Sequence, residues 1–426
     1  MARLLYTALL YLALPIILLR LWWRGRRAPA YRSRWCERLG FVTPCDSRPL
    51  WIHAVSVGET VAIAPLVELL LARRPDLPLL LTTTTPTGSE RVRALFGDRV
   101  QHAYCPWDLP DALARFLRRT RPRGCLIVET ELWPNLVHGC HAAAVPVLLA
   151  NARLSARSAK GYKRFAALTR PMLQCLSQVV AQHRDDGARF VELGLSAAQL
   201  TVSGSIKFDI ETQPHWLEAG ARLRQQWGER PLLVAGSTHE GEDAALLRVL
   251  EQLRTEFPAL LLVLVPRHPE RFEPVYQLCL EAGWSVARHS VAGHGESAPQ
   301  VGAVDVYLGD TMGELMGLYA AADITFVGGS LVPRGGHNPL EPAALGKPVL
   351  MGQQVFNFQA ICDALESAGG LTRVVDEAAL TQALRELLAD PLQRQQQGAA
   401  AQAFVAQNRG ALERLYQQVE KTLLRP

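Results

Sequence analysis

The stretch FVGGSLVPRGGHNPLEPAALGKPVL, residues 326–350, contains the elements of a strand–loop–helix–strand unit. An apolar run at residues 324–327 predicts a buried strand that ends at a pair of glycines. A helix is predicted to follow, with Asn338 as its N-cap and Pro339 at its first helical position. The next apolar run, residues 348–351, predicts a second strand. The stretch therefore predicts an α/β fold built on a parallel sheet.

Glycines and polar residues in the same stretch indicate a ligand site. The loop contains two glycine pairs, Gly328–Gly329 and Gly335–Gly336, which allow the backbone to approach a ligand closely. A helix start offers free N–H groups to an anion, so a phosphorylated ligand is favoured. An ordinary βαβ crossover without a ligand produces a similar pattern. The cluster of His337, Asn338 and Glu341 beside the glycines favours the ligand site.

The same alternation of apolar runs and helical stretches recurs along the chain. Further strands are predicted at residues 49–55, 79–83, 100–104, 125–128, 145–149, 179–182, 201–205, 232–235, 260–265 and 304–308. Polar clusters follow these runs, and in a parallel sheet ligands bind at the carboxyl ends of the strands. The pattern lapses around 208–216, which predicts two α/β halves of similar size. A loose surface loop is predicted near 290–300, and a last amphipathic helix over about 393–424 that packs across a domain surface.

Composition narrows the class of protein. A chain of 426 residues with 49% hydrophobic and 20% charged residues can hold two or three folded domains with large cores. The net charge of +5 is small and the basic residues concentrate near the N-terminus, so nucleic-acid binding is not indicated. The eight cysteines are scattered without metal-ligand spacing, which argues for a reducing compartment and against disulfides or a zinc site.

Residues 4–23, LLYTALLYLALPIILLRLWW, are apolar except for Thr7 and Arg20, and a cluster of arginines follows them. A segment of about twenty apolar residues is long enough to cross a bilayer. No small-residue cleavage site follows, so an uncleaved membrane anchor is predicted. The arginines place the body of the protein on the cytoplasmic side, against anionic head groups. Pro15, Arg20 and the Trp22–Trp23 pair leave open a helix that lies in the interface instead.

Charged residues at three predicted strand ends are candidates for catalysis. Glu59 follows the strand at 49–55, where it is either a helix-start anion stabilised by the helix dipole or a general base. Glu129 and Glu131 end another strand and, two residues apart on an extended chain, are expected to point the same way. Lys207 follows a third strand and is either a solvated surface lysine or a partner for a substrate carboxylate or phosphate.

Candidates for a nucleotide pocket lie in the second half of the chain. Arg267 and His268 follow a strongly apolar strand, and arginine suits bidentate contact with phosphate. The candidates that begin predicted helices are Gly313, Glu314, Leu315, Asn338, Pro339, Leu340 and Glu341. Together these residues predict a pocket in which Glu341 accepts hydrogen bonds from a ribose diol, one helix turn from the phosphate.

The motifs of several enzyme classes are absent from the sequence. The chain contains no GxGxxG, no GxxxxGK[ST] and no GxSxG motif, which argues against dinucleotide oxidoreductases, P-loop NTPases and typical lipases. It contains no Asp-x-Asp motif of the kind that carries a metal-bound sugar nucleotide. A transferase without a metal or cofactor therefore fits better than a metal-dependent one.

Long motifs are spread along the chain from residue 24 to residue 344: RGRRAPAYRSRW, HAVSVGET, TTTTPTGSERV, ETELWPN, NARLSARS, GSIKFD, STHEGE, VPRHPERF, GDTMGELM and FVGGSLVPRGGHNPLEPAA. In these motifs and their order the sequence resembles the 3-deoxy-D-manno-octulosonic acid (Kdo) transferases of Gram-negative bacteria, which build the inner core of lipopolysaccharide. The resemblance implies a GT-B fold, in which two Rossmann-like domains face each other across a cleft, behind an N-terminal membrane-anchoring helix. The expected segments are an anchor at 1–24, an acceptor-side domain at 25–210 and a CMP-Kdo-binding domain at 211–426.

The resemblance also implies the reaction. Kdo would pass from CMP-Kdo to the lipid A precursor lipid IVA, with inversion, at the inner membrane and without a metal, a cofactor or a nucleic acid. Glu59 matches the family's general base, which takes the proton of the acceptor hydroxyl, and Glu129 and Lys207 match positions of transition-state stabilisation. The segments that match CMP-binding positions are Arg267-His268, Gly313-Glu314-Leu315 and Asn338-Pro339-Leu340-Glu341. Arginine stabilises the charge growing on a CMP leaving group without a metal.

Two other interpretations stay open at this point. One is another GT-B glycosyltransferase that uses a UDP-sugar and a different membrane lipid. The other is a catalytically silent binding or scaffold protein at the membrane. The number of Kdo residues transferred follows from no residue pattern in the chain.

Overall fold

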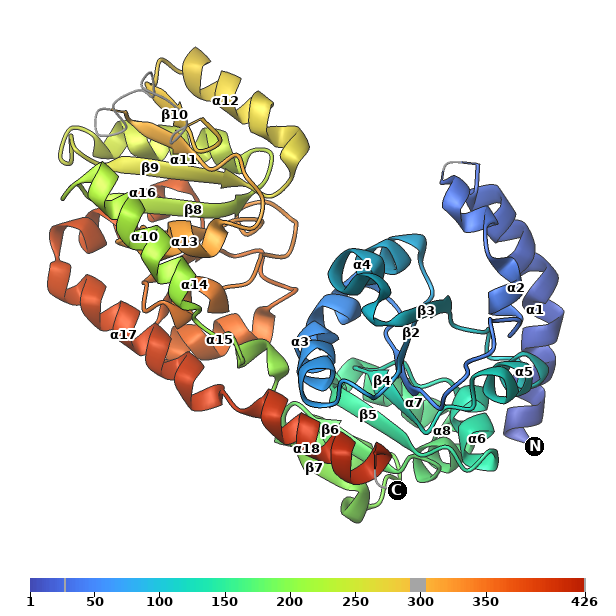
Figure 1. The fold of residues 1–426 in the computed structure, drawn as a ribbon. Coiled ribbons are helices and arrows are strands. Elements are labelled where there is room, and N and C mark those ends of the chain that lie inside the picture. Colours follow the sequence, from blue (N-terminus) through green and yellow to red (C-terminus); the bar gives the residue numbers. More distant parts are fainter. Residues whose placement is uncertain (27, 292–303, 425–426) are drawn as a thin grey trace. The chain divides into compact units, whose positions relative to one another are not determined.

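The computed structural model describes residues 1–26, 28–291 and 304–424, and the chain divides into two compact units (Figure 1). The first unit comprises Met1–Asp209 together with Arg409–Pro426, and the second comprises Ile210–Asn408. Each unit contains a seven-stranded parallel sheet with helices on both faces. The two α/β halves predicted from the alternation of apolar and helical stretches are therefore confirmed, as are the two Rossmann-like domains that the resemblance implied.

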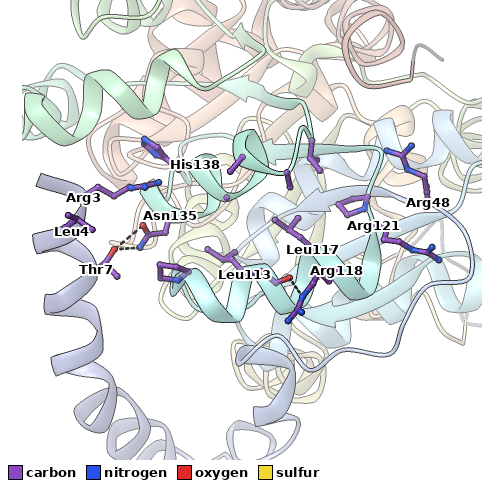
Figure 2. A pocket seen from close by; sticks show the side chains of 17 residues that line it. Arg3, Leu4, Thr7, Arg48, Leu113, Leu117, Arg118, Arg121, Asn135 and His138 are labelled. Carbon is purple, nitrogen blue, oxygen red and sulfur yellow. Dashed lines mark hydrogen bonds between the residues drawn. The ribbon is translucent and has the colours of Figure 1, made fainter. Parts of the chain in front are cut away.

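The first unit begins with α1, Ala2–Arg24, which lies along the outside of the unit beside α5, Pro110–Thr120 (Figure 1). Of the helices in the described part of the chain, α1 alone is long and apolar enough to cross a membrane, as predicted for residues 4–23. It has no fully buried residue. Its first half is hydrogen-bonded to the rest of the unit, and the pair formed by Thr7 and Asn135 is shown in Figure 2.

The sheet of the first unit has the strand order β3-β2-β1-β4-β5-β6-β7. Its strands are β1 (Leu50–His53), β2 (Leu79–Thr83), β3 (Gln101–Tyr104), β4 (Gly124–Val128), β5 (Val147–Ala152), β6 (Gln178–Ala181) and β7 (Leu200–Val202). Its other helices are α2 (Trp35–Arg38), α3 (Val57–Arg73), α4 (Pro86–Phe96), α6 (Pro134–Ala142), α7 (Ala156–Arg164), α8 (Ala166–Gln174), α9 (Arg184–Glu192) and α18 (Ala411–Leu423). The strand order reverses between the paired strands β1 and β4. Ligands bind in open α/β sheets at the carboxyl ends of strands at such a reversal.

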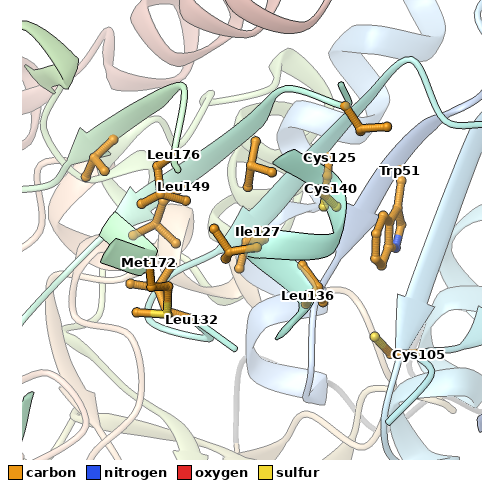
Figure 3. Packing of buried hydrophobic residues seen from close by; sticks show 14 of the residues in the cluster. Trp51, Cys105, Cys125, Ile127, Leu132, Leu136, Cys140, Leu149, Met172 and Leu176 are labelled. Carbon is orange, nitrogen blue, oxygen red and sulfur yellow. The ribbon is translucent and has the colours of Figure 1, made fainter. Parts of the chain in front are cut away.

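Helices bury both faces of this sheet, which explains why its strands read as continuous apolar runs. On one face Trp51 of β1 packs against Phe116 of α5, with ring centroids 4.7 Å apart. The same cluster contains Leu136 of α6 and Leu149 of β5 (Figure 3). On the other face, side chains of α3 and α18 pack in a second cluster.

The end of the chain differs from the prediction. The single helix expected over about 393–424 is two helices, α17 (Pro391–Asn408) and α18, and Gly410 between them has a φ of +86°. Asp209 fixes this break, because its carboxylate accepts a hydrogen bond from the N–H of Gly410 at 2.6 Å. The apolar face of α18 is buried in the first unit. The second unit therefore ends before α18 and not at residue 426, where the predicted domain ended.

The sheet of the second unit has the order β10-β11-β9-β8-β12-β13-β14, with its reversal between β8 and β12. Its strands are β8 (Leu232–Thr238), β9 (Leu261–Pro266), β10 (Val286–Arg288), β11 (Val306–Leu308), β12 (Ile324–Val327), β13 (Val349–Gly352) and β14 (Leu371–Val374). Its helices besides α17 are α10 (Pro214–Trp227), α11 (Glu242–Leu253), α12 (Phe272–Glu281), α13 (Leu315–Ala321), α14 (Leu340–Ala344), α15 (Gln359–Ser367) and α16 (Glu377–Ala389). The loop predicted near 290–300 falls largely at 292–303, outside the described residues.

Candidate active site

The first unit brings two of the predicted carboxylates to one edge of its sheet. Glu59 lies in the first turn of α3, after β1, and Glu129 directly follows β4. Because β1 and β4 pair where the strand order reverses, both residues lie at the edge where ligands bind in this fold. The sequence predicted this edge, and the strand order shows that its two carboxylates follow adjacent strands.

Glu59 is held by a set of short hydrogen bonds at the start of α3. Its Oε2 accepts from the N–H of Val55 at 2.7 Å, and its Oε1 accepts from the hydroxyl of Ser56, the N-cap, at 2.9 Å. These bonds favour the ionised form. Burial outweighs them and, with smaller effects from the charges of Glu131 and Glu129, raises the pKa of Glu59 to about 7. Glu59 is therefore a helix-start carboxylate that also takes up a proton near neutral pH.

Glu129 adopts a backbone conformation that is unusual for a residue with a side chain. Its φ is +60°, in the left-handed region, which costs roughly 1–2 kcal/mol. Its Oε2 lies 3.4 Å from Nε of Arg153. Glu131 accepts a hydrogen bond from the indole N–H of Trp133 at 3.1 Å. The prediction of an extended chain from Glu129 to Glu131 was wrong, because the backbone turns at Glu129.

Lys207 lies in a short 3-10 helix, Ile206–Phe208, after β7, and is half-buried, not a solvated surface lysine. Burial lowers its pKa, the charge of Glu129 acts to raise it, and the charge of Arg153 lowers it further. Asn151 ties the loop to β5, since its Oδ1 accepts from the N–H of Ile206 at 3.4 Å. Lys207, Glu129 and Arg153 thus form one charged group at the sheet edge.

Sequence reasoning did not single out Arg153 or Asn151 as site residues. Both belong to the motif NARLSARS, and Asn151 has a φ of +52° inside β5. Non-glycine residues in this region cluster at functional sites. Two such residues, Glu129 and Asn151, therefore end neighbouring strands at the proposed catalytic edge. The sequence signal that could have identified Asn151 and Arg153 is the polar run NARLSARS directly after the apolar strand predicted at 145–149.

In the second unit, Arg267 and His268 follow β9 and lie beside two further histidines. Nε2 of His239, which follows β8, is 2.8 Å from Nε2 of His337, and the two rings stack. The ring of His268 meets that of His239 edge-on at a centroid distance of 5.5 Å. Burial lowers the pKa of His337 to about 4, with further lowering by His239, Arg267 and His268. His337 is therefore neutral at neutral pH, and Arg267 contributes positive charge beside it.

Asn338 and Glu341 belong to the same group of side chains. Asn338 Nδ2 donates to Glu341 Oε1 at 3.2 Å, and Asn338 Oδ1 accepts from the N–H of Leu340 at 3.2 Å. Burial raises the pKa of Glu341, against the effects of Asn338 and of the charge of Arg267. α14 begins at Leu340, with Pro339 as its N-cap, and has five residues. The prediction that placed Asn338 at the N-cap was one residue early, and the helix start has fewer free N–H groups than expected.

The glycine loop after β12 binds a carboxylate of the protein itself. Glu242, buried at the start of α11, accepts hydrogen bonds from the N–H groups of Gly329, Ser330 and Leu331 at 2.7–3.0 Å. It also accepts from the N–H of His239 at 2.9 Å. Glu242 therefore occupies these loop N–H groups, which leaves them unavailable to a ligand anion.

Gly313, Glu314 and Leu315 lie at the start of α13, which packs against α14. Gly313 and Glu314 line a cavity of about 400 Å³ together with residues of α10 and with Tyr307. Glu314 is paired with His289, whose Nε2 lies 3.1 Å from Glu314 Oε2. Arg267 and Asn338 are not among the residues that line this cavity. The charge of Arg267 acts on Glu341, which joins the Arg267 and Asn338 segments.

Comparison with known proteins shows relatives that match nearly the whole chain. The family 3-deoxy-D-manno-octulosonic-acid transferase (kdotransferase) matches residues 33–210. The chain is 43% identical over 420 residues to the 3-deoxy-D-manno-octulosonic acid transferase of Haemophilus influenzae, covering 97% of both chains. It is 39% identical to the enzyme of the same name from Bordetella pertussis, covering 99% of this chain and 100% of that one.

Among solved structures, a UDP-N-acetylglucosamine 2-epimerase shares the fold, with a TM-score of 0.53 at 15% identity over 88% of this chain and 96% of that chain. That likeness concerns the two-domain architecture alone. The near full-length sequence identity to two transferases decides the family. The chain belongs to the 3-deoxy-D-manno-octulosonic acid transferase family, the glycosyltransferases that transfer Kdo in lipopolysaccharide biosynthesis.

Proposed function

We propose that the protein transfers Kdo from CMP-Kdo to a hydroxyl of the lipid A precursor lipid IVA, with inversion at the anomeric carbon. Family membership supports the sugar and the pathway. The observation that carries the mechanism is the pKa of about 7 of Glu59 at the sheet edge where the strand order reverses. A carboxylate with that pKa is ionised in about half of the molecules at neutral pH and is a strong enough base to accept a hydroxyl proton during attack.

In this mechanism Glu59 takes the proton as the acceptor oxygen forms its bond to the anomeric carbon of Kdo. The bond from that carbon to the phosphate oxygen breaks on the opposite face, and CMP leaves with the electron pair. Lys207 is half-buried near Glu129 and Arg153, and its amino group suits the carboxylate that Kdo carries. Glu129 positions these cations and supports positive charge that develops on the sugar.

The second unit supplies the proposed CMP site. Arg267 binds the phosphate, Glu341 accepts hydrogen bonds from the ribose, and Asn338 orients Glu341 through its 3.2 Å hydrogen bond. His268, Pro339 and Leu340 form the surrounding wall. Gly313, Glu314 and Leu315 remain part of the proposal as backbone at the start of α13. In the described residues, no three His, Cys, Asp or Glu side chains converge as metal ligands do. We propose metal-independent transfer.

Mass spectrometry of lipid IVA incubated with CMP-Kdo and the purified protein tests donor, acceptor and number of residues together. The expected product is heavier by one or more Kdo residues, and NMR of its anomeric centre should show inversion. A parallel panel of UDP-hexoses separates the donors. Turnover of a UDP-hexose with none of CMP-Kdo overturns the proposal. If Glu59→Gln has unchanged activity, Glu59 is not the general base. Such a result would favour a catalytically silent protein whose preparation contains a contaminating enzyme.

We also propose that α1 and the arginines after it hold the protein on the cytoplasmic face of the inner membrane. The support is the exposure of large apolar side chains along α1: Leu12 is 75% exposed and Ile16 is 69% exposed. Exposed apolar side chains at helical spacing bind a lipid interface, and neighbouring arginines add attraction to anionic head groups. Flotation of the full chain with liposomes, and its loss in a chain that lacks residues 1–24, tests this anchoring.

A further inference from the structure

The hydrogen bonds that α1 forms with the rest of the first unit indicate its orientation relative to the membrane. Three side chains in its first half bond to the folded unit: Tyr6 to Asp108 at 2.9 Å, Thr7 to Asn135 at 2.9 Å, and Tyr11 to Asp111. If α1 crossed the bilayer, these three side chains would lie in hydrocarbon, and their partners would either be lost or be pulled into it. The bonded geometry therefore places α1 along the membrane surface.

The face of α1 turned away from these bonds is apolar. Leu5, Leu9, Leu12, Ile16 and Leu19 recur at intervals of three or four residues, and each is more than half exposed. Because the bonded face is fixed to the folded unit, the part of that unit next to α1 lies at the lipid surface as well. The neighbouring elements are α5 and α6.

A groove of about 850 Å³ opens between α1, α5 and α6 (Figure 2). Its floor is apolar and includes Leu113, Leu117, Gly139 and Val145. Leu4 of α1 contributes to one wall. The groove is thus continuous with the lipid-facing helix and has a lining suited to a hydrocarbon chain.

Cationic side chains stand at the ends and rim of the groove. Arg3 lies at one end, Arg48 and Arg121 lie at the other, and Arg118 lies between the ends (Figure 2). None of these four arginines forms an ion pair with another described residue. Unpaired arginines beside an apolar groove complement a ligand that combines a hydrocarbon chain with a phosphate.

The position of these arginines separates the groove from the catalytic edge. Arg48 comes two residues before β1 and Arg121 three residues before β4, so both lie near the amino ends of the strands. Glu59 and Glu129 lie at the carboxyl ends. A lipid phosphate bound by Arg48 and Arg121 would therefore lie at the amino-end edge of the sheet, whereas the proposed catalytic residues lie at its carboxyl-end edge.

We propose that the groove binds one anionic phospholipid of the bilayer, with an acyl chain on the apolar floor and its phosphate at Arg48, Arg118 and Arg121. This proposal rests on the membrane anchoring proposed above. The bound lipid seats the first unit on the membrane surface alongside α1. The acceptor of the transfer reaction is not its occupant.

Substitution of Gly139 tests the floor of the groove. A Cβ atom at Gly139 would lie 3.9 Å from Leu113 and from Leu117, so a leucine side chain enters the groove without a clash at its base. Gly161 of α7 is the matched control, because a Cβ there meets nothing within 4 Å. Both changes replace a helical glycine by a better helix former, so neither should lower Tm.

The measurement is native mass spectrometry of the full chain in mild detergent with phosphatidylglycerol. We expect a one-to-one complex for the wild type and for Gly161→Leu, and loss of the complex in Gly139→Leu. We expect Gly139→Leu to transfer Kdo in detergent at the wild-type rate. Retention of the complex in Gly139→Leu overturns the proposal, as does an increased KM for lipid IVA in this variant, which would make the groove the acceptor site. Failure of Kdo transfer by the wild type, with Gly139-dependent lipid binding intact, would reject the proposed function alone.

Charge reversal tests the phosphate end. Arg118→Glu in α5 should weaken binding to phosphatidylglycerol vesicles roughly thirtyfold, since the reversal changes the charge by two units and each unit near an anionic surface contributes about 1 kcal/mol. Lys421→Glu in α18, an exposed change of the same charge in the same unit, should leave binding unchanged. Neither variant should alter binding to phosphatidylcholine vesicles. Equal weakening by the two variants would show unspecific attraction and overturn the proposal.

Discussion

Replacement of Glu59 by glutamine isolates its ionisation from its structural role. Glutamine keeps an oxygen that can accept from the N–H of Val55, and its amide can donate to the hydroxyl of Ser56, so the start of α3 is preserved. Alanine would remove both of these hydrogen bonds, each of which contributes about 1 kcal/mol of stability. A loss of activity in Glu59→Gln therefore reports on proton transfer.

The pKa of about 7 sets the expected pH dependence. The ionised fraction of Glu59 is about 0.09 at pH 6 and about 0.91 at pH 8, so kcat/KM of the wild type should rise about tenfold over this interval. Removal of a general base costs roughly 100- to 10,000-fold in rate. We expect Glu59→Gln to fall in that range at pH 8 and to lose the rise between pH 6 and pH 8, while CMP binding is retained.

The assay is the initial rate of Kdo transfer to lipid IVA from pH 5.5 to 8.5, with CMP affinity measured in parallel by calorimetry. Stability gives an independent check. The folded-state pKa of Glu59 lies above its usual 4.5, so the wild type loses folding stability as pH rises through about 7, whereas glutamine does not titrate. The Tm of Glu59→Gln minus that of the wild type should therefore be larger at pH 8 than at pH 5. A pH rise that persists in the variant would refute the assignment, and loss of CMP binding with an intact fold would refute the assignment of CMP to the second unit.

Three further outcomes are expected. Arg267→Ala should weaken CMP binding about 10- to 100-fold by calorimetry, because a charge-assisted hydrogen bond to phosphate is lost, whereas Lys421→Ala should not change it. Glu242→Gln should lower the free energy of unfolding in urea by about 2–3 kcal/mol. The amide NH₂ of glutamine would face backbone N–H groups that now donate hydrogen bonds to the carboxylate. An unchanged urea midpoint would contradict this prediction. EDTA should leave Kdo transfer unchanged, and a loss that added Mg²⁺ restores would contradict the metal-independent mechanism.

Local sequence was sufficient for the elements and for the edge of the sheet at which the site lies. Apolar runs such as residues 324–327 have the length and composition of buried strands, and polar residues after them mark the carboxyl ends. A helix start near Glu59 was also expected, although the helix was predicted to begin at Val61 and α3 begins at Val57. These features depend on contacts between residues a few positions apart.

Hydrogen bonds between residues far apart in the chain could not be predicted from local sequence. Glu242 bonds to Gly329 across 87 positions, and its motif STHEGE gives no sign of the loop that it binds. The return of α18 to the first unit depends in the same way on Asp209, which lies 201 positions before Gly410. An amphipathic helix specifies that one of its faces is buried, but not which sheet buries it. The strand order is likewise a property of the packed sheet.

The charged group in the first unit acts on the pKa of Glu59. The charge of Glu129 raises that pKa, and no cation is among the influences on Glu59. Arg153 lies 3.4 Å from Glu129 and partly offsets its charge. Replacement of Arg153 by methionine should therefore raise the pKa of Glu59 and shift the pH profile of transfer to higher pH, and an unchanged profile would show that the ion pair does not act on Glu59.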